Sequence, residues 1–172
     1  MKVGVLSDSP LLTTGYGVPT RHLCQRFHDA GIDVACLGIH EVVIGCRENT
    51  LPYRVWPTCP HDANGVELME YFLHAEKPDV LLLLNTLTVC NEWTLLIRRK
   101  FKIMTPALIY FSVEGAPLSP DWFSVFRFIQ GAVAWTQHTQ QSAREAYNVK
   151  TDFVYMGVDH DVFRPYDAGL RT

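Results

Sequence analysis

The architecture of this chain follows from residues 2–17, KVGVLSDSPLLTTGYG. The stretch begins as a short apolar strand over residues 3–6 and runs directly into a loop that ends in Gly15, Tyr16 and Gly17, with a helix behind it. In an open α/β sheet the first strand is usually central, and ligands bind beyond its carboxyl end. Glycine lets the backbone approach a ligand closely, and a helix N-terminus favours negative charge. The stretch therefore predicts a binding site for a phosphate or another polar group.

The rest of the chain alternates between strand and helix patterns. The clearest strand is residues 80–84, VLLLL, because a continuous apolar run after a helix is typical of a parallel strand covered on both faces. Further strands are expected over residues 33–38, 107–111, 131–135 and 151–155, and helices over residues 19–30, 65–75 (capped by Asn64), 91–101, from Ser119-Pro120 onward, and from Thr136 or Thr139 to Tyr147. Two β-like pieces, residues 40–46 and 53–56, form either a hairpin or a third strand with an excursion. This alternation predicts a Rossmann-like, doubly wound α/β fold: a mainly parallel sheet with helices on both faces.

Composition places the chain among globular proteins. Its 172 residues, 48% hydrophobic and 19% charged, predict one domain with a generous core. The net charge of -3 excludes a general attraction to nucleic acid or to an acidic membrane. No apolar run is long enough to span a membrane, and a strand begins after two residues, so neither a transmembrane segment nor a signal peptide is expected. Five cysteines without a C-x-x-C pair indicate reduced thiols in a cytoplasmic protein, and no structural metal site.

Polar side chains follow several of the expected strands. Asp8 lies in the first loop, Asn85 follows strand 80–84, and Glu114 lies in the loop after strand 107–111. A glutamate at this edge can accept hydrogen bonds from sugar hydroxyls or act as a base, and the alternative is a solvated loop carboxylate. For Asp8 the alternative is an Asx turn. These three residues are candidates for ligand binding.

Two basic features are also candidates. His138 follows strand 131–135, where it either contacts a ligand phosphate or is a surface histidine at the start of a helix. Residues 98–102, RRKFK, form the one basic cluster of the sequence. Because the cluster closes a helix, where cations complement the helix dipole, a structural role is predicted rather than a patch for an anionic acceptor.

Several common nucleotide and hydrolase motifs are absent. Thr20 stands where a dinucleotide-binding loop needs its third glycine, the loop is too long, and residues 37–39, LGI, replace the expected ribose-binding acid. The sequence also lacks a phosphate-binding P-loop and the G-x-S-x-G turn of serine hydrolases. Nicotinamide binding is therefore disfavoured, and the other two classes are excluded.

The most specific pattern is YMGVDHDVFRP at residues 155–165. It resembles the GVD-x-x-x-F-x-P element that ends the amino-terminal domain of retaining, nucleotide-sugar-dependent glycosyltransferases of the GT-B fold, in particular glycosyltransferase family 4. Other segments are similar to that family in the same order: the glycine loop before Thr20-Arg21-His22-Leu23, then Ala30-Gly31-Ile32-Asp33-Val34, Lys77-Pro78-Asp79-Val80, and YFSVEG at residues 110–115 followed by Pro117-Leu118 and Trp122. The resemblance spans nearly the whole chain.

The resemblance implies an acceptor-side domain over residues 1–165, with the start of a linker or tail at residues 166–172. Its partners would be a carboxyl-terminal donor-binding domain that this chain does not contain, a nucleotide-sugar donor, and a sugar or glycosylated acceptor. No metal or cofactor would be needed, and the chain alone would be inactive. Glu114 would be catalytic where many members have a histidine, and Thr136 replaces the usual serine. Substrate or donor would contact Gly15, Tyr16, Gly17, Asp8, Asn85, Thr136, His138 and Gly157.

Two other functional classes remain as alternatives. The first is a stand-alone, non-catalytic α/β binding module, because the chain is long enough to close a core by itself. The second, weaker one is a nicotinamide-dependent enzyme. If the glycine loop is one wall of an interdomain cleft, Gly17→Val is expected to fold normally and to abolish transfer in the complete enzyme.

Overall fold

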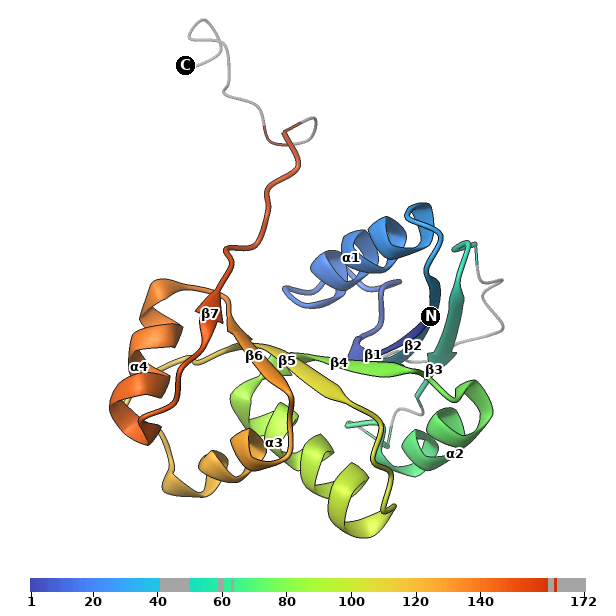
Figure 1. Ribbon diagram of the computed structural model, residues 1–172. Helices are drawn as coiled ribbons and strands as arrows, with labels where there is room; N and C mark the ends of the chain where they lie inside the picture. The colour runs from blue at the N-terminus through green and yellow to red at the C-terminus, as the bar shows by residue number, and fades with distance from the viewer. Residues whose placement is uncertain (41–49, 59–60, 63, 161–162, 164–172) are drawn as a thin grey trace, which may run out of the picture.

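Seven parallel strands form one sheet within the described part of the chain (Figure 1). The structure is a computed structural model that describes residues 1–40, 50–58, 61, 62, 64–160 and 163. The strands are β1 (Lys2–Asp8), β2 (Asp33–Ile39), β3 (Arg54–Pro57), β4 (Val80–Thr86), β5 (Ala107–Ser112), β6 (Gly131–Ala134) and β7 (Asp152–Phe153), in the order β3-β2-β1-β4-β5-β6-β7. The predicted doubly wound, Rossmann-like fold is confirmed.

The strand order reverses beside β1. This strand pairs with β2 on one side, with Asp8 level with Ile39, and with β4 on the other, with Leu6 level with Leu83. Because Leu6 is level with Leu83, Asp8, two residues later on β1, lies level with Asn85, two residues later on β4. Ligands of open α/β sheets bind at such a reversal, beyond the carboxyl ends of the strands. The fold therefore places Asp8 and Asn85 at the edge where ligands of such sheets bind.

Helices cover both faces of the sheet (Figure 1). They are α1 (Gly17–Asp29), α2 (Val66–Glu76), α3 (Leu87–Leu95) with a π-helical continuation (Leu96–Lys100), a 3-10 helix (Pro120–Arg127) and α4 (Gln137–Tyr147). Helix α1 lies on one face, where buried Cys24 packs with Val3, Val5, Val34 and Cys36. Helices α2 and α3 lie on the other face.

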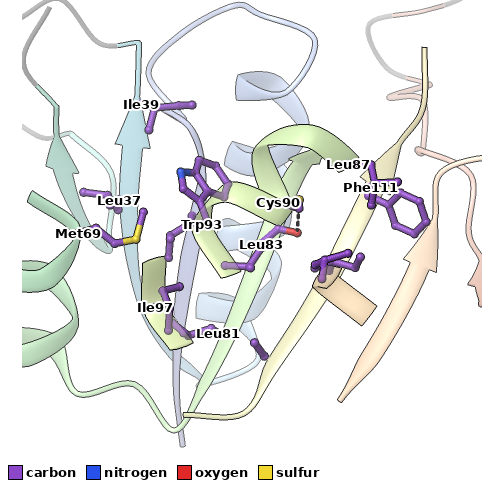
Figure 2. Packing of buried hydrophobic residues seen from close by; sticks show 14 of the residues in the cluster. Leu37, Ile39, Met69, Leu81, Leu83, Leu87, Cys90, Trp93, Ile97 and Phe111 are labelled. Carbon is purple, nitrogen blue, oxygen red and sulfur yellow. Dashed lines mark hydrogen bonds between the residues drawn. The ribbon is translucent and has the colours of Figure 1, made fainter. Parts of the chain in front are cut away.

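The larger core lies under α2 and α3 (Figure 2). Its largest fully buried side chains are Trp93, Phe72 and Phe111. The Trp93 indole Nε1 donates to the Asn64 carbonyl at 2.7 Å, so the one polar atom of this side chain is satisfied. The thiol of Cys90 donates to the Leu83 carbonyl at 3.7 Å, and burial raises its pKa to about 12. Within the described residues Cys24 and Cys90 are buried free thiols, as predicted, and Cys36 is buried too.

Two helix starts differ from the prediction. Helix α2 is capped by Asp62, whose carboxylate oxygens accept from the backbone N–H groups of Val66 at 2.8 Å and Glu67 at 2.9 Å. The predicted cap, Asn64, donates its side-chain amide to Glu92 instead, at 2.6 Å. The prediction was wrong because the chain turns once more before the helix, with Gly65 in the left-handed region at φ +69°. Helix α3 begins at Leu87 rather than at residue 91.

Other local predictions have mixed outcomes. Arg98 of the basic cluster is buried and donates to the carbonyls of Phe128 and Ile103, which confirms its structural role. The last strand is shorter than the predicted 151–155. Most of the piece at residues 40–46 lies outside the described residues, as do the predicted domain boundary at residue 165 and the segment 166–172.

Candidate functional site at the carboxyl edge

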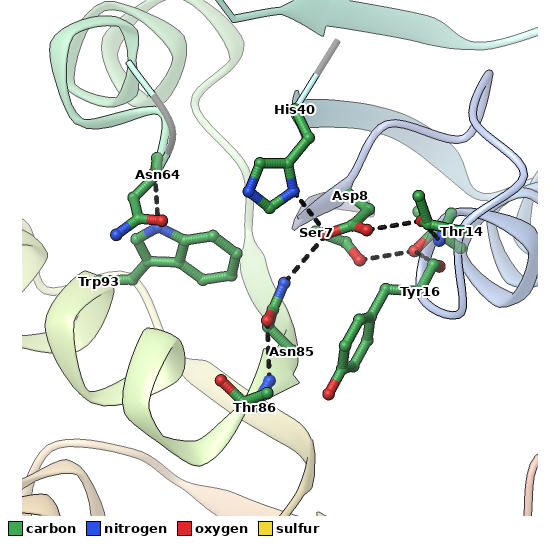
Figure 3. A network of polar contacts seen from close by, with 11 residues as sticks. Ser7, Asp8, Thr14, Tyr16, His40, Asn64, Asn85, Thr86 and Trp93 are labelled. Atoms are coloured by element: carbon green, nitrogen blue, oxygen red, sulfur yellow. Dashed lines mark hydrogen bonds and ion pairs between the residues drawn. The ribbon is translucent and has the colours of Figure 1, made fainter. Parts of the chain in front are cut away.

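Asp8 is the centre of a polar network at the end of β1 (Figure 3). Its side chain is buried, and oxygen Oδ2 accepts from the Thr14 hydroxyl at 2.6 Å. Oxygen Oδ1 accepts from the side-chain amide of Asn85 at 3.4 Å and lies 3.3 Å from Nδ1 of His40. The network thus joins the ends of β1, β2 and β4 with the first loop. A buried carboxylate is stable in such a place because donors surround it.

The first loop is folded tightly against itself. The backbone N–H of Gly17 donates to the Thr14 hydroxyl at 2.9 Å. A Cβ atom added to Gly17 would lie 2.7 Å from the carbonyl oxygens of Ser9 and Leu12, which are backbone atoms and cannot move aside cheaply. Gly15, by contrast, is exposed and has no atom near the position of such a Cβ. The expectation that Gly17→Val folds normally is therefore wrong.

Thr20, the residue that breaks the dinucleotide pattern, has a structural role. It is fully buried in α1, and its hydroxyl lies 2.6 Å from Oγ of Ser7 and 2.7 Å from the carbonyl of Tyr16. A glycine at this position would lose both contacts, of which the one with Ser7 joins α1 to β1. The Thr20 hydroxyl thus holds α1 to the sheet at the position where a dinucleotide-binding turn has a glycine. The loop therefore differs from a dinucleotide-binding turn.

Tyr16, Trp135 and Tyr110 form an aromatic cluster, the aromatic wall, in which Tyr16 is next to the first loop. Its hydroxyl is 2.6 Å from Oγ of Ser112, and its ring centroid lies 4.7 Å from that of Trp135, which in turn lies 5.6 Å from Tyr110. Burial raises the pKa of Tyr16 to about 12; the Ser112 hydrogen bond opposes this rise, and the charge of Glu114 adds to it. Tyr16 is therefore a neutral phenol at physiological pH.

The remaining predicted site residues lie around this edge. Glu114 is exposed in the loop after β5, and its charge contributes to the raised pKa of Tyr16. Thr136 caps α4, since its hydroxyl accepts from the backbone N–H of Thr139 at 3.0 Å. His138 is exposed in the first turn of α4, and Gly157 lies in the exposed segment after β7. The structure brings Asp8, Asn85 and Tyr16 into the edge, whereas no contact joins His138 or Gly157 to Asp8.

Sequence reasoning missed three residues of this edge. His40 was assigned to a strand that continued past it, and no role was given to Ser112 or Trp135. A signal was available for two of them, because Ser112 directly follows the expected strand 107–111 and Trp135 ends the expected strand 131–135. The sequence pattern does not tell toward which neighbours these side chains point, because that depends on packing between segments far apart in the chain.

Among the described residues, no group of three or more histidine, cysteine, aspartate or glutamate side chains is arranged to hold a metal ion. No helix in this part of the chain is both long and apolar enough to cross a membrane.

Comparison with known proteins identifies the fold. No protein-family model and no curated protein matches the sequence. Among solved structures, MurG from Acinetobacter baumannii matches over 90% of this chain and 44% of its own, with 13% identity and a TM-score of 0.56. UDP-GlcNAc 2-epimerase from Methanocaldococcus jannaschii matches over 91% of this chain and 45% of its own, with 11% identity and a TM-score of 0.55. Both are GT-B fold proteins. The chain has the fold of one half of a GT-B protein. It spans less than half the length of either neighbour, which is consistent with an N-terminal GT-B domain.

Proposed function

We propose that this GT-B half is the acceptor-binding, amino-terminal domain of a retaining glycosyltransferase that uses a nucleotide-sugar donor. The donor site would be supplied by a second domain, facing the carboxyl edge across a cleft. The observation that carries the proposal is the Asp8 network, which gathers polar side chains from β1, β2 and β4 at the strand reversal. One structural neighbour is by its name an epimerase of UDP-GlcNAc, which supports nucleotide-sugar chemistry for this half fold.

The chemistry of the edge suits a sugar acceptor. A sugar ring presents hydroxyl groups at its rim and C–H bonds on its faces, so it is bound by a few placed polar groups beside aromatic surface. Asp8 and Asn85 supply the polar groups, and Tyr16 with Trp135 supplies the aromatic surface. Glu114, in the loop that follows β5 at the same edge of the sheet, is the catalytic candidate.

Acceptor binding can be mapped on the chain itself. We expect methyl glycosides, titrated into isotopically labelled protein, to shift the backbone resonances of Asn85, Ser112 and Thr136 in nuclear magnetic resonance spectra. The variant Asp8→Asn should weaken this binding about fivefold or more, because it removes the charge on which the network converges. Asp29→Asn is the matched control. Asp29 ends α1 and accepts a hydrogen bond from the side-chain amide of Gln25, and the amide oxygen of an asparagine can accept the same bond.

Two outcomes would contradict the proposal. In the first, glycosides shift resonances only at the opposite, amino edge of the sheet. In the second, Asp8→Asn and Asp29→Asn bind every glycoside as the unchanged chain does. The predicted cytoplasmic location is not addressed by this experiment and stays a prediction.

A further inference from the structure

His40 occupies an unusual backbone position at the site. It directly follows β2 and has a φ of +64°, in the left-handed region that non-glycine residues seldom adopt. Its side chain is 49% exposed, whereas that of Asp8, 3.3 Å from its Nδ1 atom, is 7% exposed. Residues held in this region are concentrated at functional sites, where surrounding contacts determine their conformation. The imidazole thus contacts a buried carboxylate, while about half of its own surface is exposed to solvent.

The contacts of Asp8 are all contacts to donors. The Thr14 hydroxyl accepts from the Gly17 N–H, so its single hydrogen is directed to Asp8. The Asn85 side-chain oxygen accepts from the Thr86 N–H at 2.9 Å, which turns the amide hydrogens of Asn85 toward Asp8. The contacts with Thr14 and Asn85 alone therefore show that both oxygens of Asp8 act as hydrogen-bond acceptors.

An acceptor at Nδ1 determines the tautomer of the neutral ring. A neutral imidazole has one N–H donor and one bare nitrogen. With Nδ1–H directed to Asp8, the lone pair is on Nε2. No described residue forms a hydrogen bond with Nε2 of His40 (Figure 3). Within the described part of the chain, this nitrogen is available to a donor of a bound ligand.

We propose that Nε2 of His40, set by Asp8, accepts a hydrogen bond from one hydroxyl group of the sugar acceptor and so fixes which hydroxyl is presented. The inference rests on the proposed function and adds a specificity-determining residue to it. Asp8 acts here as a positioning residue. An acceptor nitrogen selects a hydroxyl, which donates, over a fluorine atom at the same position, which only accepts.

The tautomer is the first measurement. In alkaline buffer, long-range 1H–15N spectra of the histidine rings should show His40 with a protonated Nδ1 and a bare Nε2. Asp8→Asn removes the negative charge that holds the proton of His40 on Nδ1, so the fraction of the ring that carries its proton on Nε2 should rise. His74→Asn, an exposed position at the end of α2, is the control for assignment and folding. A protonated Nε2 in the unchanged chain would overturn the inference.

The second measurement uses methyl glycosides and their monodeoxy-fluoro analogues. We expect one fluorine position to weaken binding about five- to tenfold in the unchanged chain. In His40→Gly, which keeps the positive φ without strain, the same fluorine position should make no difference. Added imidazole should partly restore the discrimination. His40→Asn, which also tolerates this backbone region, provides a second folded variant.

The outcomes separate the two proposals. If glycosides shift the edge resonances but His40→Gly still discriminates against the fluorinated analogue, the role of His40 is wrong and the proposed function stands. If no glycoside shifts any resonance of the edge, the proposed function fails and this inference fails with it.

Discussion

At the scale of single residues, the site depends on close fits that leave little freedom for substitution. Gly17 is the clearest case, because its hydrogen lies where any side chain would meet two carbonyl oxygens. Asp8 is another, since Thr14 of the first loop, His40 after β2 and Asn85 of β4 converge on its carboxylate. A change at either position alters the fold and the site together. Functional tests therefore need variants that separate these effects.

We predict that Gly17→Ala destabilises the protein by about 1–3 kcal/mol, since the added Cβ atom would lie 2.7 Å from two backbone oxygens and the loop must shift to admit it. Gly15→Ala is the control: its Cβ meets no atom, so we expect a change within about 0.5 kcal/mol. The free energy of unfolding, measured with urea, checks both. Equal stabilities for the two variants would show that the loop is not packed as described.

At the scale of elements, an ion-pair cluster ties α2 to the amino edge of the sheet. Buried Glu76 ends α2 and contacts Nζ of Lys2 on β1 at 2.7 Å, Nη2 of Arg54 on β3 at 2.9 Å and the indole of Trp56 at 2.7 Å. Burial opposes ionisation of Glu76, but the hydrogen bonds from Lys2 and Trp56 and the charge of Arg54 outweigh it, so the pKa is lowered. This carboxylate stabilises the fold in its charged form.

We predict that Glu76→Gln costs about 1.5–3 kcal/mol near neutral pH, the usual worth of hydrogen bonds to a charged group. A lowered pKa means that the stabilisation is complete above the ordinary glutamate value and is lost as pH falls through the pKa of the folded state. The difference in unfolding free energy between the two proteins should therefore shrink in acid. A difference that stayed constant down to pH ~2 would contradict the assigned role.

The cap of α2 gives a second prediction at this scale. Asp62→Ala should destabilise the protein by about 1–2 kcal/mol, because two backbone N–H groups at the helix start lose their acceptor. Asn64→Ala removes only an exposed side-chain contact with Glu92 and should change stability by less than about 0.5 kcal/mol. Thermal denaturation of both variants distinguishes the cap in the structure from the one that sequence reasoning predicted.

The elements also show what a sequence can and cannot predict. The VLLLL run predicted β4 because a strand covered on both faces needs an apolar side chain at every consecutive position. Asp8 and Asn85 were predicted as site residues because strand ends meet at one edge of a parallel sheet. The pairing of Asp8 with His40 was beyond reach, since it depends on the register of β1 against β2 and on a positive φ. The cap of α2 was missed for a related reason, because Gly65 adds a turn that no periodicity reveals.

At the scale of the whole molecule, the cations of the Glu76 cluster and the carboxylates of the candidate site lie at opposite edges of the sheet. The ion-paired cations Lys2 and Arg54 lie at the amino edge or beside it, where they are already engaged with Glu76. The carboxyl edge holds the carboxylates of Asp8 and Glu114. An edge of this kind suits neutral hydroxyl groups and repels a diphosphate. Under the proposed function this half would supply the acceptor wall of a cleft, and within the described residues the Asp8 network brings no lysine or arginine to that wall.

We predict that nucleotide sugars bind this chain with a Kd of about 1 mM or weaker, corresponding to about 4 kcal/mol. The reason is that the phosphates find no free cation within the Asp8 network, and one wall of a cleft buries too little of the ligand. Calorimetric titration with UDP-glucose and GDP-mannose tests this, with methyl glycosides as the neutral comparison. The variant Glu114→Gln should strengthen donor binding only slightly, because removing one exposed carboxylate relieves repulsion without adding a donor. Micromolar binding of either nucleotide sugar would show that the donor site lies on this half, and the assignment of the carboxyl edge to the acceptor would have to be abandoned.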